Sequence, residues 1–409
     1  MSPDDIIHDL DTLREALKIS GVPITVDGRI GSKLVGIVSN RDTDFIVDRT
    51  TPLKEVMTPI DQVVTGLYPL SINDANKLLK ESKKGYLPIV DKEGNLKALT
   101  TRTDLKKNRA FPMSSKDNDG RLLVGAAVKA GARDPLDEYR ITKLHEAGCN
   151  IIVLDAQNGD NEKQISLIHY IKEKFPNMDV VAGNVVRVSQ AKALLDAGAD
   201  ALRIGMGAGS VATTQLVKAI GRAQLSSIYS CAYLARQYEV PVIADGGIKN
   251  TGCLIKALAL GASCVMMGSL LAGVEECPGE YFFQDGMRLK HYRGVQSYNA
   301  ANSGESSIMG SPIKGTPSRL RTLSMGGPEL PKIASGVNGA VQDKGSLNSY
   351  FPYLCQSIRH GLQDMGVRSL TMLWERLYNG ELRFEIRSPS AQKEGGVHDL
   401  HSFSQRLYA

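Results

Sequence analysis

Polar and glycine residues that could hold a sugar phosphate follow two of the apolar runs in this sequence. Asp245-Gly246-Gly247 comes directly after Val240–Ala244, and Gly268-Ser269 comes directly after Cys264–Met267. A carboxylate at a strand end can accept hydrogen bonds from both hydroxyls of a ribose, and glycine amides can approach a phosphate closely. One glycine pair is weak evidence, because tight turns require glycine anyway. The two pairs together predict a site for a ribose phosphate.

A loop at residues 205–215 joins another glycine-rich strand end to hydroxyl and amide side chains. It contains Ser210, Thr214 and Gln215, but Ala212 stands among them and the loop has no cysteine. All six cysteines lie elsewhere in the chain: Cys149, Cys231, Cys253, Cys264, Cys277 and Cys355. Their scattered spacing, without a CxxC pair, favours a reducing compartment, the cytosol or the nucleus.

From residue 122 onward, apolar runs alternate with stretches that have helical spacing. Six of these runs are predicted strands: Leu122–Val128, Asn150–Asp155, Val180–Val185, Ala201–Gly205, Val240–Ala244 and Cys264–Met267. Near-continuous apolar strands that alternate with helices indicate an α/β fold with a parallel sheet. Polar residues at the carboxyl ends of the strands are typical of the (β/α)8 TIM barrel, which requires eight strands. Six of the eight are evident.

The first 110 residues contain a repeat. Each copy is a strand, a turn with an acidic residue and glycine, a second strand, and a closing Ser/Thr-x-x-Asp motif at a helix start. Leu34 and Leu96 occupy equivalent positions, as do Asp42 and Asp104, so both pairs are 62 residues apart. Agreement in period, turn and closing motif indicates two copies of one structural unit.

Length and composition exclude several classes of protein. The 409 residues are sufficient for two or three domains, and 42% apolar and 23% charged residues are ordinary for a globular protein. The net charge of +5 comes without a long basic run, which argues against a nucleic-acid partner. No run of 18 apolar residues predicts a membrane span, and the acidic N-terminus is unlike a secretory signal.

Across essentially its whole length the chain resembles the inosine-5′-monophosphate (IMP) dehydrogenase family, on the strand-end motifs and the loop described above. The resemblance implies NAD-dependent oxidation of IMP to xanthosine monophosphate (XMP) in guanine nucleotide synthesis, in the cytoplasm and also the nucleus. It places the phosphate of the nucleotide on Ser210, on Gly246 and Gly247, on Gly268 and Ser269, and on Tyr292. It places the ribose on Asp245.

The resemblance also implies cofactor sites and an assembly. NAD would contact Asp155, Asn184 and Gly205, of which Asp155 is followed by Ala156 where the family has serine. A potassium ion would be held by main-chain carbonyls of Gly207, Gly209 and Ala212, completed by Glu394-Gly395-Gly396 of a neighbouring subunit. A C-terminal turn is the alternative for the last motif. The family is tetrameric, so we expect a homo-tetramer or a hetero-oligomer with an active paralogue.

The sequence departs from the family at the residues that carry out the chemistry. Ala212 occupies the position of the cysteine that attacks the purine, while Thr214 is retained. A mobile flap is expected at about 295–335, where Arg321 is a candidate base but no tyrosine follows it; a solvated loop arginine is the alternative. Ser335 stands where the family reads the purine ring with glutamine. Without an attacking thiolate, C2 of the purine cannot become tetrahedral and release hydride.

The N-terminal repeat resembles a tandem pair of cystathionine-β-synthase (CBS) modules, a Bateman domain. The modules are expected at about 1–58 and 59–110, ahead of a barrel domain at 111–409. Such modules bind ATP or GTP, and the resemblance places the ribose on Ser39 and Asp42 and on Thr101 and Asp104. The alternative is that these residues cap the helices that follow them.

Family members carry two further βα units before the Bateman domain. Because this sequence begins at Met1 where that domain begins, we expect the first two barrel strands to be missing, supplied by a partner, or lost from a truncated record. Three hypotheses follow: an inactive purine-nucleotide-binding relative with a regulatory role, a functional NAD-dependent IMP dehydrogenase with an incomplete sequence, and a decayed protein that barely folds.

Overall fold

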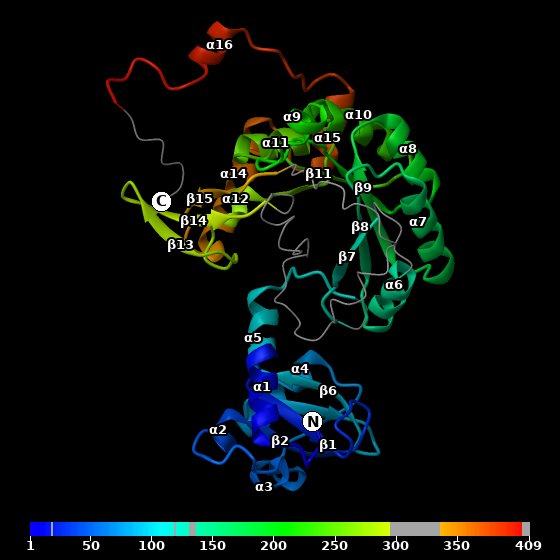
Figure 1. Ribbon diagram of the computed structural model, residues 1–409, viewed down its shortest axis with the longest axis vertical. Coiled ribbons are helices and arrows are strands. Elements are labelled where there is room, and N and C mark those ends of the chain that lie inside the picture. The colour runs from blue at the N-terminus through cyan, green and yellow to red at the C-terminus, as the bar shows by residue number, and fades with distance from the viewer. Residues whose placement is uncertain (18, 118–119, 131–135, 295–335, 403–409) are drawn as a thin grey trace, which may run out of the picture. The chain divides into compact units, whose positions relative to one another are not determined.

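The computed structural model describes residues 1–17, 19–117, 120–130, 136–294 and 336–402. Within it the chain forms two compact units, Met1–Leu122 and Leu123–Ala409, which are described separately (Figure 1). No helix among the described residues is both long and apolar enough to cross a membrane.

The N-terminal unit consists of two similar halves, each with a three-stranded sheet. The elements of the first half are α1 (Ile7–Leu17), β1 (Gly21–Thr25), β2 (Leu34–Ser39), α2 (Asn40–Thr43), α3 (Leu53–Val56) and β3 (Thr58–Pro59). Those of the second are η1 (Ile60–Gln62), β4 (Gly66–Leu67), α4 (Ile72–Ser82), β5 (Tyr86–Val90), β6 (Leu96–Thr101) and α5 (Arg102–Ala110). Each half buries its own apolar core, around Leu10 in one and around Leu79 in the other.

The two halves meet through equivalent residues. Lys33 and Asn95 form an antiparallel bridge. The amide of Leu34 donates to the carbonyl of Gly94 at 3.0 Å, and the amide of Leu96 donates to the carbonyl of Ser32 at 2.9 Å. Lys33 and Asn95 are 62 residues apart, which is the period of the repeat. The two hydrogen bonds are equivalent, because adding 62 to Ser32 and Leu34 gives Gly94 and Leu96. The halves are therefore related by a local two-fold rotation, as the repeat in the sequence suggests.

The C-terminal unit is built on a six-stranded parallel sheet that curls into part of a barrel, with the strand order β12-β11-β10-β9-β8-β7 (Figure 1). The strands are β7 (Gly125–Lys129), β8 (Ile151–Asp155), β9 (Asp179–Val185), β10 (Ala201–Ile204), β11 (Val242–Asp245) and β12 (Cys264–Met266). The six predicted strands and the α/β class are thus confirmed. The first strand begins at Gly125, three residues later than predicted.

Helices cover the outer face of this sheet. They are α6 (Asp137–Glu146), α7 (Glu162–Lys174), α8 (Val188–Asp196), α10 (Gln224–Gln237) and α11 (Thr251–Ala259), and the short α9 (Thr214–Lys218) follows the loop at 205–213. Fully buried side chains such as Ile152 and Leu202 on the strands and Ile171 and Leu194 on the helices form the main core. This layer of apolar contacts holds the strand ends in place.

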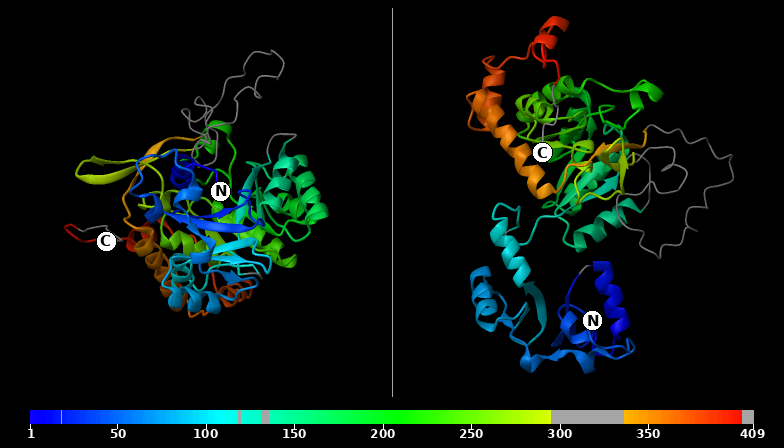
Figure 2. Two further views of the ribbon diagram at one scale, coloured as in Figure 1. Left: turned by 90° about the horizontal axis from the view of Figure 1, so that it is seen from below. Right: turned by 90° about the vertical axis from the view of Figure 1, so that its left-hand side faces the viewer.

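The rest of the unit extends the sheet end that follows β12. It comprises α12 (Ser269–Ala272), an antiparallel sheet of β13 (Tyr281–Gln284), β14 (Met287–Tyr292) and β15 (Gly339–Gln342), and the helices α14 (Leu347–Asp364), α15 (Leu370–Tyr378) and α16 (Pro389–Glu394). α14 packs against α11 (Figure 2). The indole nitrogen of Trp374 donates to the carbonyl of Leu258 at 2.8 Å, which ties α15 to the end of α11.

Candidate functional site

A polar network joins the carboxyl ends of four adjacent strands. Arg203 projects from β10, and only 13% of its side chain is exposed. Its guanidinium donates to the carboxylate of Asp155 on β8 and to the side-chain oxygen of Asn184 on β9, and its Nε lies 3.5 Å from Asp245 Oδ2 on β11. A buried cation is tolerated only when anions or acceptors surround it. Arg203 is therefore the centre of this polar end of the sheet.

Asn184 orients the two groups that are expected to meet the ligands. This buried amide donates to the carbonyl of Gly205 at 2.7 Å and to Asp245 Oδ2 at 3.0 Å. The carboxylate of Asp245 is held at one oxygen, and an ionised carboxylate has further lone pairs that can accept from ribose hydroxyls. Asp245 is thus fixed in position, and its carboxylate can still accept hydrogen bonds from the hydroxyls of a ribose.

The predicted phosphate residues lie at neighbouring strand ends. Gly246 and Gly247 have φ of 95° and 76°, the left-handed region that favours glycine. A Cβ on Gly246 would lie 3.2 Å from the amide of Gly209, so the 205–213 loop packs directly on this turn. At the next strand end, a Cβ on Gly268 would lie 2.7 Å from the hydroxyl of Tyr292. The two glycine turns thus follow the paired strands β11 and β12, and Ser210, which is exposed, directly follows Gly209.

A buried lysine that the sequence reading did not select supports this arrangement. Lys290 is 1% exposed, and its ammonium donates to the carbonyl of Val274 at 2.6 Å, to that of Glu275 at 3.4 Å and to that of Cys277. It also lies 4.6 Å from the centre of the Tyr281 ring. Because Lys290 and Tyr292 are two positions apart on β14, this anchor fixes the strand that carries Tyr292 against the segment that follows α12.

Gln224 makes a second contact that only the fold reveals. Its side-chain amide donates to the carbonyl of Ile204 at 2.9 Å and to that of Asp245 at 3.1 Å. The strand ends approach so closely here that a Cβ on Gly205 would lie 1.9 Å from the Asp245 carbonyl oxygen. Only glycine fits at residue 205, which explains on structural grounds why the loop has a glycine at this position.

The loop that bears Ala212 is closed by hydrogen bonds of its own. Gln215 donates to the carbonyl of Gly207 at 2.7 Å, and the amide of Ala212 donates to the carbonyl of Gly209 at 3.1 Å. Ala212 also forms an antiparallel bridge with Gly336. The side chain at the centre of the loop is a methyl group, and Thr214, which is buried, begins α9.

The carbonyls expected to hold potassium remain compatible with a cation, since a carbonyl oxygen has a second lone pair. Glu394, Gly395 and Gly396 lie at the end of α16, where the amide of Gly395 donates to Ala391 and that of Gly396 donates to Lys393. These bonds stay within one local segment.

Three of the six cysteines are poorly suited to replace the missing thiol at Ala212. Burial raises the pKa of the Cys231 thiol in α10 to about 11. Cys264 begins β12 and Cys149 precedes β8, so both lie at the amino ends of strands, opposite the site. A thiol with a raised pKa is a poor nucleophile near neutral pH.

Two of the predicted site residues, Arg321 and Ser335, and the predicted flap at about 295–335 lie outside the described residues. In the N-terminal unit, the closing motifs form helix caps. The amide of Ser39 donates to the Asp42 carboxylate at 2.6 Å, and that of Thr101 donates to the Asp104 carboxylate at 2.9 Å. The same two-bond arrangement recurs in both halves, because each hydroxyl also donates to its aspartate.

Comparison with known proteins agrees with this geometry. The family described as IMP dehydrogenase / GMP reductase domain matches residues 50–398. The inosine-5′-monophosphate dehydrogenase of Toxoplasma gondii is 45% identical over 448 residues, covering 100% of this chain and 80% of that protein. The enzyme of the same name from Caenorhabditis elegans is 44% identical over 430 residues, covering 100% of this chain and 77% of its own length.

A solved structure is similar as well. The crystal structure of a cysteine-to-alanine variant of GMP reductase from Trypanosoma brucei, in complex with guanosine 5′-monophosphate, has a TM-score of 0.78 and 31% identity. The match covers 98% of this chain and 78% of that chain. On these similarities and on the strand-end site described above, the chain belongs to the IMP dehydrogenase / GMP reductase family.

Proposed function

We propose that this chain binds a purine nucleoside monophosphate of the IMP or XMP type and does not oxidise it. The observation that carries the proposal is the contrast between two parts of one site. The close packing of Gly246 on the 205–213 loop and of Gly268 on Tyr292 supports binding, whereas the same loop carries the methyl group of Ala212 where the family has a cysteine. Covalent catalysis has no substitute when the attacking atom is absent.

The proposed binding mode uses groups whose positions are fixed. Asp245 would take the ribose hydroxyls, and the amides of Gly247 and Ser269 with the hydroxyl of Tyr292 would take the phosphate. Asn184, Arg203 and Lys290 would act indirectly, by holding these groups. Such preorganisation lowers the entropy lost when the ligand is ordered.

The residues at the expected NAD site match that cofactor less completely than the strand-end residues match a nucleoside monophosphate. Asp155 accepts from Arg203 and is about half exposed, so its carboxylate could still meet the ribose next to nicotinamide. NAD would supply the hydride acceptor if it bound there, and potassium would order the 205–213 loop through main-chain oxygens. Ala156, where the resemblance expects a serine, offers no side-chain donor or acceptor to the nicotinamide.

The N-terminal unit is proposed to be a pair of CBS modules that bind ATP or GTP. Its support is the 62-residue repeat, the shared capping geometry and the two-fold contact at Lys33 and Asn95. The caps use one carboxylate oxygen of Asp42 and of Asp104, which leaves the other oxygen for a ribose. Tetrameric assembly, or assembly with an active paralogue, is part of the same proposal.

A working NAD-dependent IMP dehydrogenase is the competing function, favoured by the names of the relatives. Isothermal titration with IMP and with inosine, together with absorbance at 340 nm in the presence of IMP and NAD, distinguishes the two. The proposal expects IMP to bind more tightly than inosine, with no formation of NADH. A sustained rise in absorbance would overturn it, and absence of IMP binding with an intact cooperative melt would remove the binding function.

A further inference from the structure

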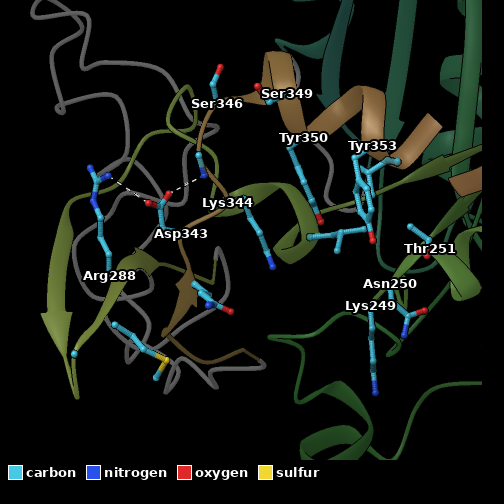
Figure 3. Close-up of a pocket in the computed structure, with 16 residues that line it drawn as sticks. Lys249, Asn250, Thr251, Arg288, Asp343, Lys344, Ser346, Ser349, Tyr350 and Tyr353 are labelled. Carbon is cyan, nitrogen blue, oxygen red and sulfur yellow. Dashed lines mark hydrogen bonds and ion pairs between the residues drawn. The ribbon is translucent and has the colours of Figure 1, made fainter. Parts of the chain in front are cut away.

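We propose that the C-terminal unit contains a second anion site, separate from the purine monophosphate site, that takes a small phosphate compound. The site is a cavity of about 970 Å³ among the start of α11, the β13–β14 turn, the segment after β15 and the start of α14 (Figure 3). This volume is at the upper end of the range for small-molecule sites, roughly 300–1,000 Å³. The proposal goes beyond nucleotide binding at the strand ends.

The charge of the lining is the first argument. Lys249, Arg288 and Lys344 line the cavity with one carboxylate, that of Asp343. Asp343 Oδ2 lies 3.3 Å from Arg288 Nη1, and its Oδ1 accepts from the hydroxyl of Tyr281 and from the amide of Gly345. The carboxylate is therefore committed to Arg288 and to its own turn, as the dashed lines in Figure 3 show.

The two lysines have no such partner. Within the ranges that the structure describes, no carboxylate lies within 4.0 Å of the ammonium of Lys249 or of Lys344. Lys344 approaches only the ring of Tyr350, at 5.9 Å from the ring centre. The lining carries three positive charges and one negative charge, a surplus of two. A phosphate ester carries between roughly 1.5 and 2 negative charges near pH 7, which matches this surplus.

The two helix ends around the cavity are already capped by side chains. Glu276 already occupies the start of α14, since it accepts from Ser346 Oγ at 2.6 Å and from the amide of Leu347 at 2.8 Å. Asn250 caps α11 by accepting from the amide of Cys253 at 2.9 Å. Because side chains already cap both helix ends, the attraction for an anion comes from Lys249 and Lys344. Tyr350 and Tyr353 supply an apolar wall.

The cavity is a neighbour of the phosphate cradle and not a part of it. Lys249 follows Gly247 by two residues, and Leu270 follows Ser269 directly, so the same two turns separate the sites. Asp245, Gly268 and Tyr292 do not line the cavity. An occupant of the cavity would thus press on the turns that hold the monophosphate without touching it.

Isothermal titration of the full chain with inorganic pyrophosphate at 50 mM salt tests this proposal. The combined variant Lys249→Gln and Lys344→Gln is expected to bind at least tenfold more weakly than the unchanged chain, and added salt should weaken binding by the unchanged chain. Lys256→Gln, which removes an exposed charge from the last turn of the same helix α11, is the matched control and should bind normally. Circular dichroism of each variant shows whether it is folded.

Tyr292→Phe separates this proposal from the monophosphate site. This variant is expected to weaken the binding of IMP and to leave the binding of pyrophosphate unchanged. Pyrophosphate binding that is lost in Tyr292→Phe, or kept in the combined lysine variant, would overturn the second site, as would absence of binding by the unchanged chain. None of these outcomes decides whether IMP binds, so failure of the second site and failure of the proposed function are distinguishable.

Discussion

At the scale of single residues, the proposed site combines candidate nucleotide-binding groups with a loop whose central residue, Ala212, has no nucleophilic atom in its side chain. Ala212 lies in a loop closed by Gln215 and paired with Gly336, so the main chain is ordered although the side chain is inert. We expect the residues around it to leave the site inactive even with a thiol at this position. Arg203 and Asn184 serve the geometry of the site, and neither supplies a nucleophile.

Replacing the alanine is the direct test at this scale. Ala212→Cys is expected to leave NADH formation from IMP and NAD below detection at 340 nm, because Ala156 also lacks the expected contact to nicotinamide and a general base is not restored. Intact mass measurement after incubation with IMP checks for a covalent adduct. Turnover in this single variant would show that alanine alone accounts for the loss.

The raised pKa of Cys231 gives a second prediction for a single residue. Burial favours the thiol over the thiolate, so the pKa of Cys231 is raised from its ordinary value of 9.0 to about 11 in the folded chain. Its contribution to stability is therefore complete below pH 9 and is lost as the pH rises toward 11. At pH 8, iodoacetamide should modify Cys231 in the urea-unfolded chain and spare it in the folded chain, as peptide mass mapping would show. Rapid modification in the folded chain would contradict the assigned burial.

At the scale of secondary structure, β14 is the element that links the phosphate site to the rest of the unit. Lys290 is its one buried residue and fixes it through three main-chain carbonyls. Removal of the ammonium would leave buried carbonyls without donors, at a cost of about 1–3 kcal/mol.

Lys290→Met should therefore lower the free energy of unfolding by about 2 kcal/mol in urea. It should weaken the binding of IMP more than the binding of inosine, because Tyr292 would lose its fixed position relative to Gly268. Lys256→Met, at an exposed position, is the control and should change stability by less than about 0.5 kcal/mol. Equal weakening of IMP and inosine would show that Lys290 acts only on overall stability.

The two halves of the N-terminal unit allow another element-scale prediction. α1 and α4 both have 11 residues, and the position of Arg14 in α1 corresponds to that of the buried Leu79 in α4. Arg14 bonds Thr43 at 2.8 Å, but its Nε and Nη2 are buried without a partner among the described residues, and burial lowers its pKa. Arg14→Leu should raise the free energy of unfolding of this unit by about 1 kcal/mol. Destabilisation would mean that the guanidinium contributes more than its burial costs.

The sequence was sufficient for the parallel strands and insufficient for the supporting contacts. Runs such as Val180–Val185 are apolar enough to predict buried strands, and these were confirmed. β14 was not predicted, because its sequence Met-Arg-Leu-Lys-His-Tyr is rich in charge and its lysine is buried only in the folded chain. Gln224 and Arg203 act on strands distant in sequence, which local patterns cannot indicate. The ligand assignments themselves stay predictions.

At the scale of the whole molecule, the division into two units has a measurable consequence. The single tryptophan, Trp374, lies in the C-terminal unit, so its fluorescence reports on that unit alone, whereas far-ultraviolet circular dichroism reports on both. The two signals should follow different transitions in urea. IMP should stabilise the C-terminal unit and so shift the fluorescence transition, and ATP or GTP should stabilise the N-terminal unit. Each ligand should raise the free energy of unfolding of its unit by about 2.7 kcal/mol at a concentration of 100 times Kd. Coincident transitions would show that the units unfold together.

The contact between Lys33 and Asn95 has a consequence for how the N-terminal unit can be divided. Since each half offers the other the same stretch of main chain, a polypeptide that ends near residue 58 keeps an edge complementary to itself. Two copies of that short fragment are expected to join as a symmetric dimer through Lys33, which analytical ultracentrifugation would detect.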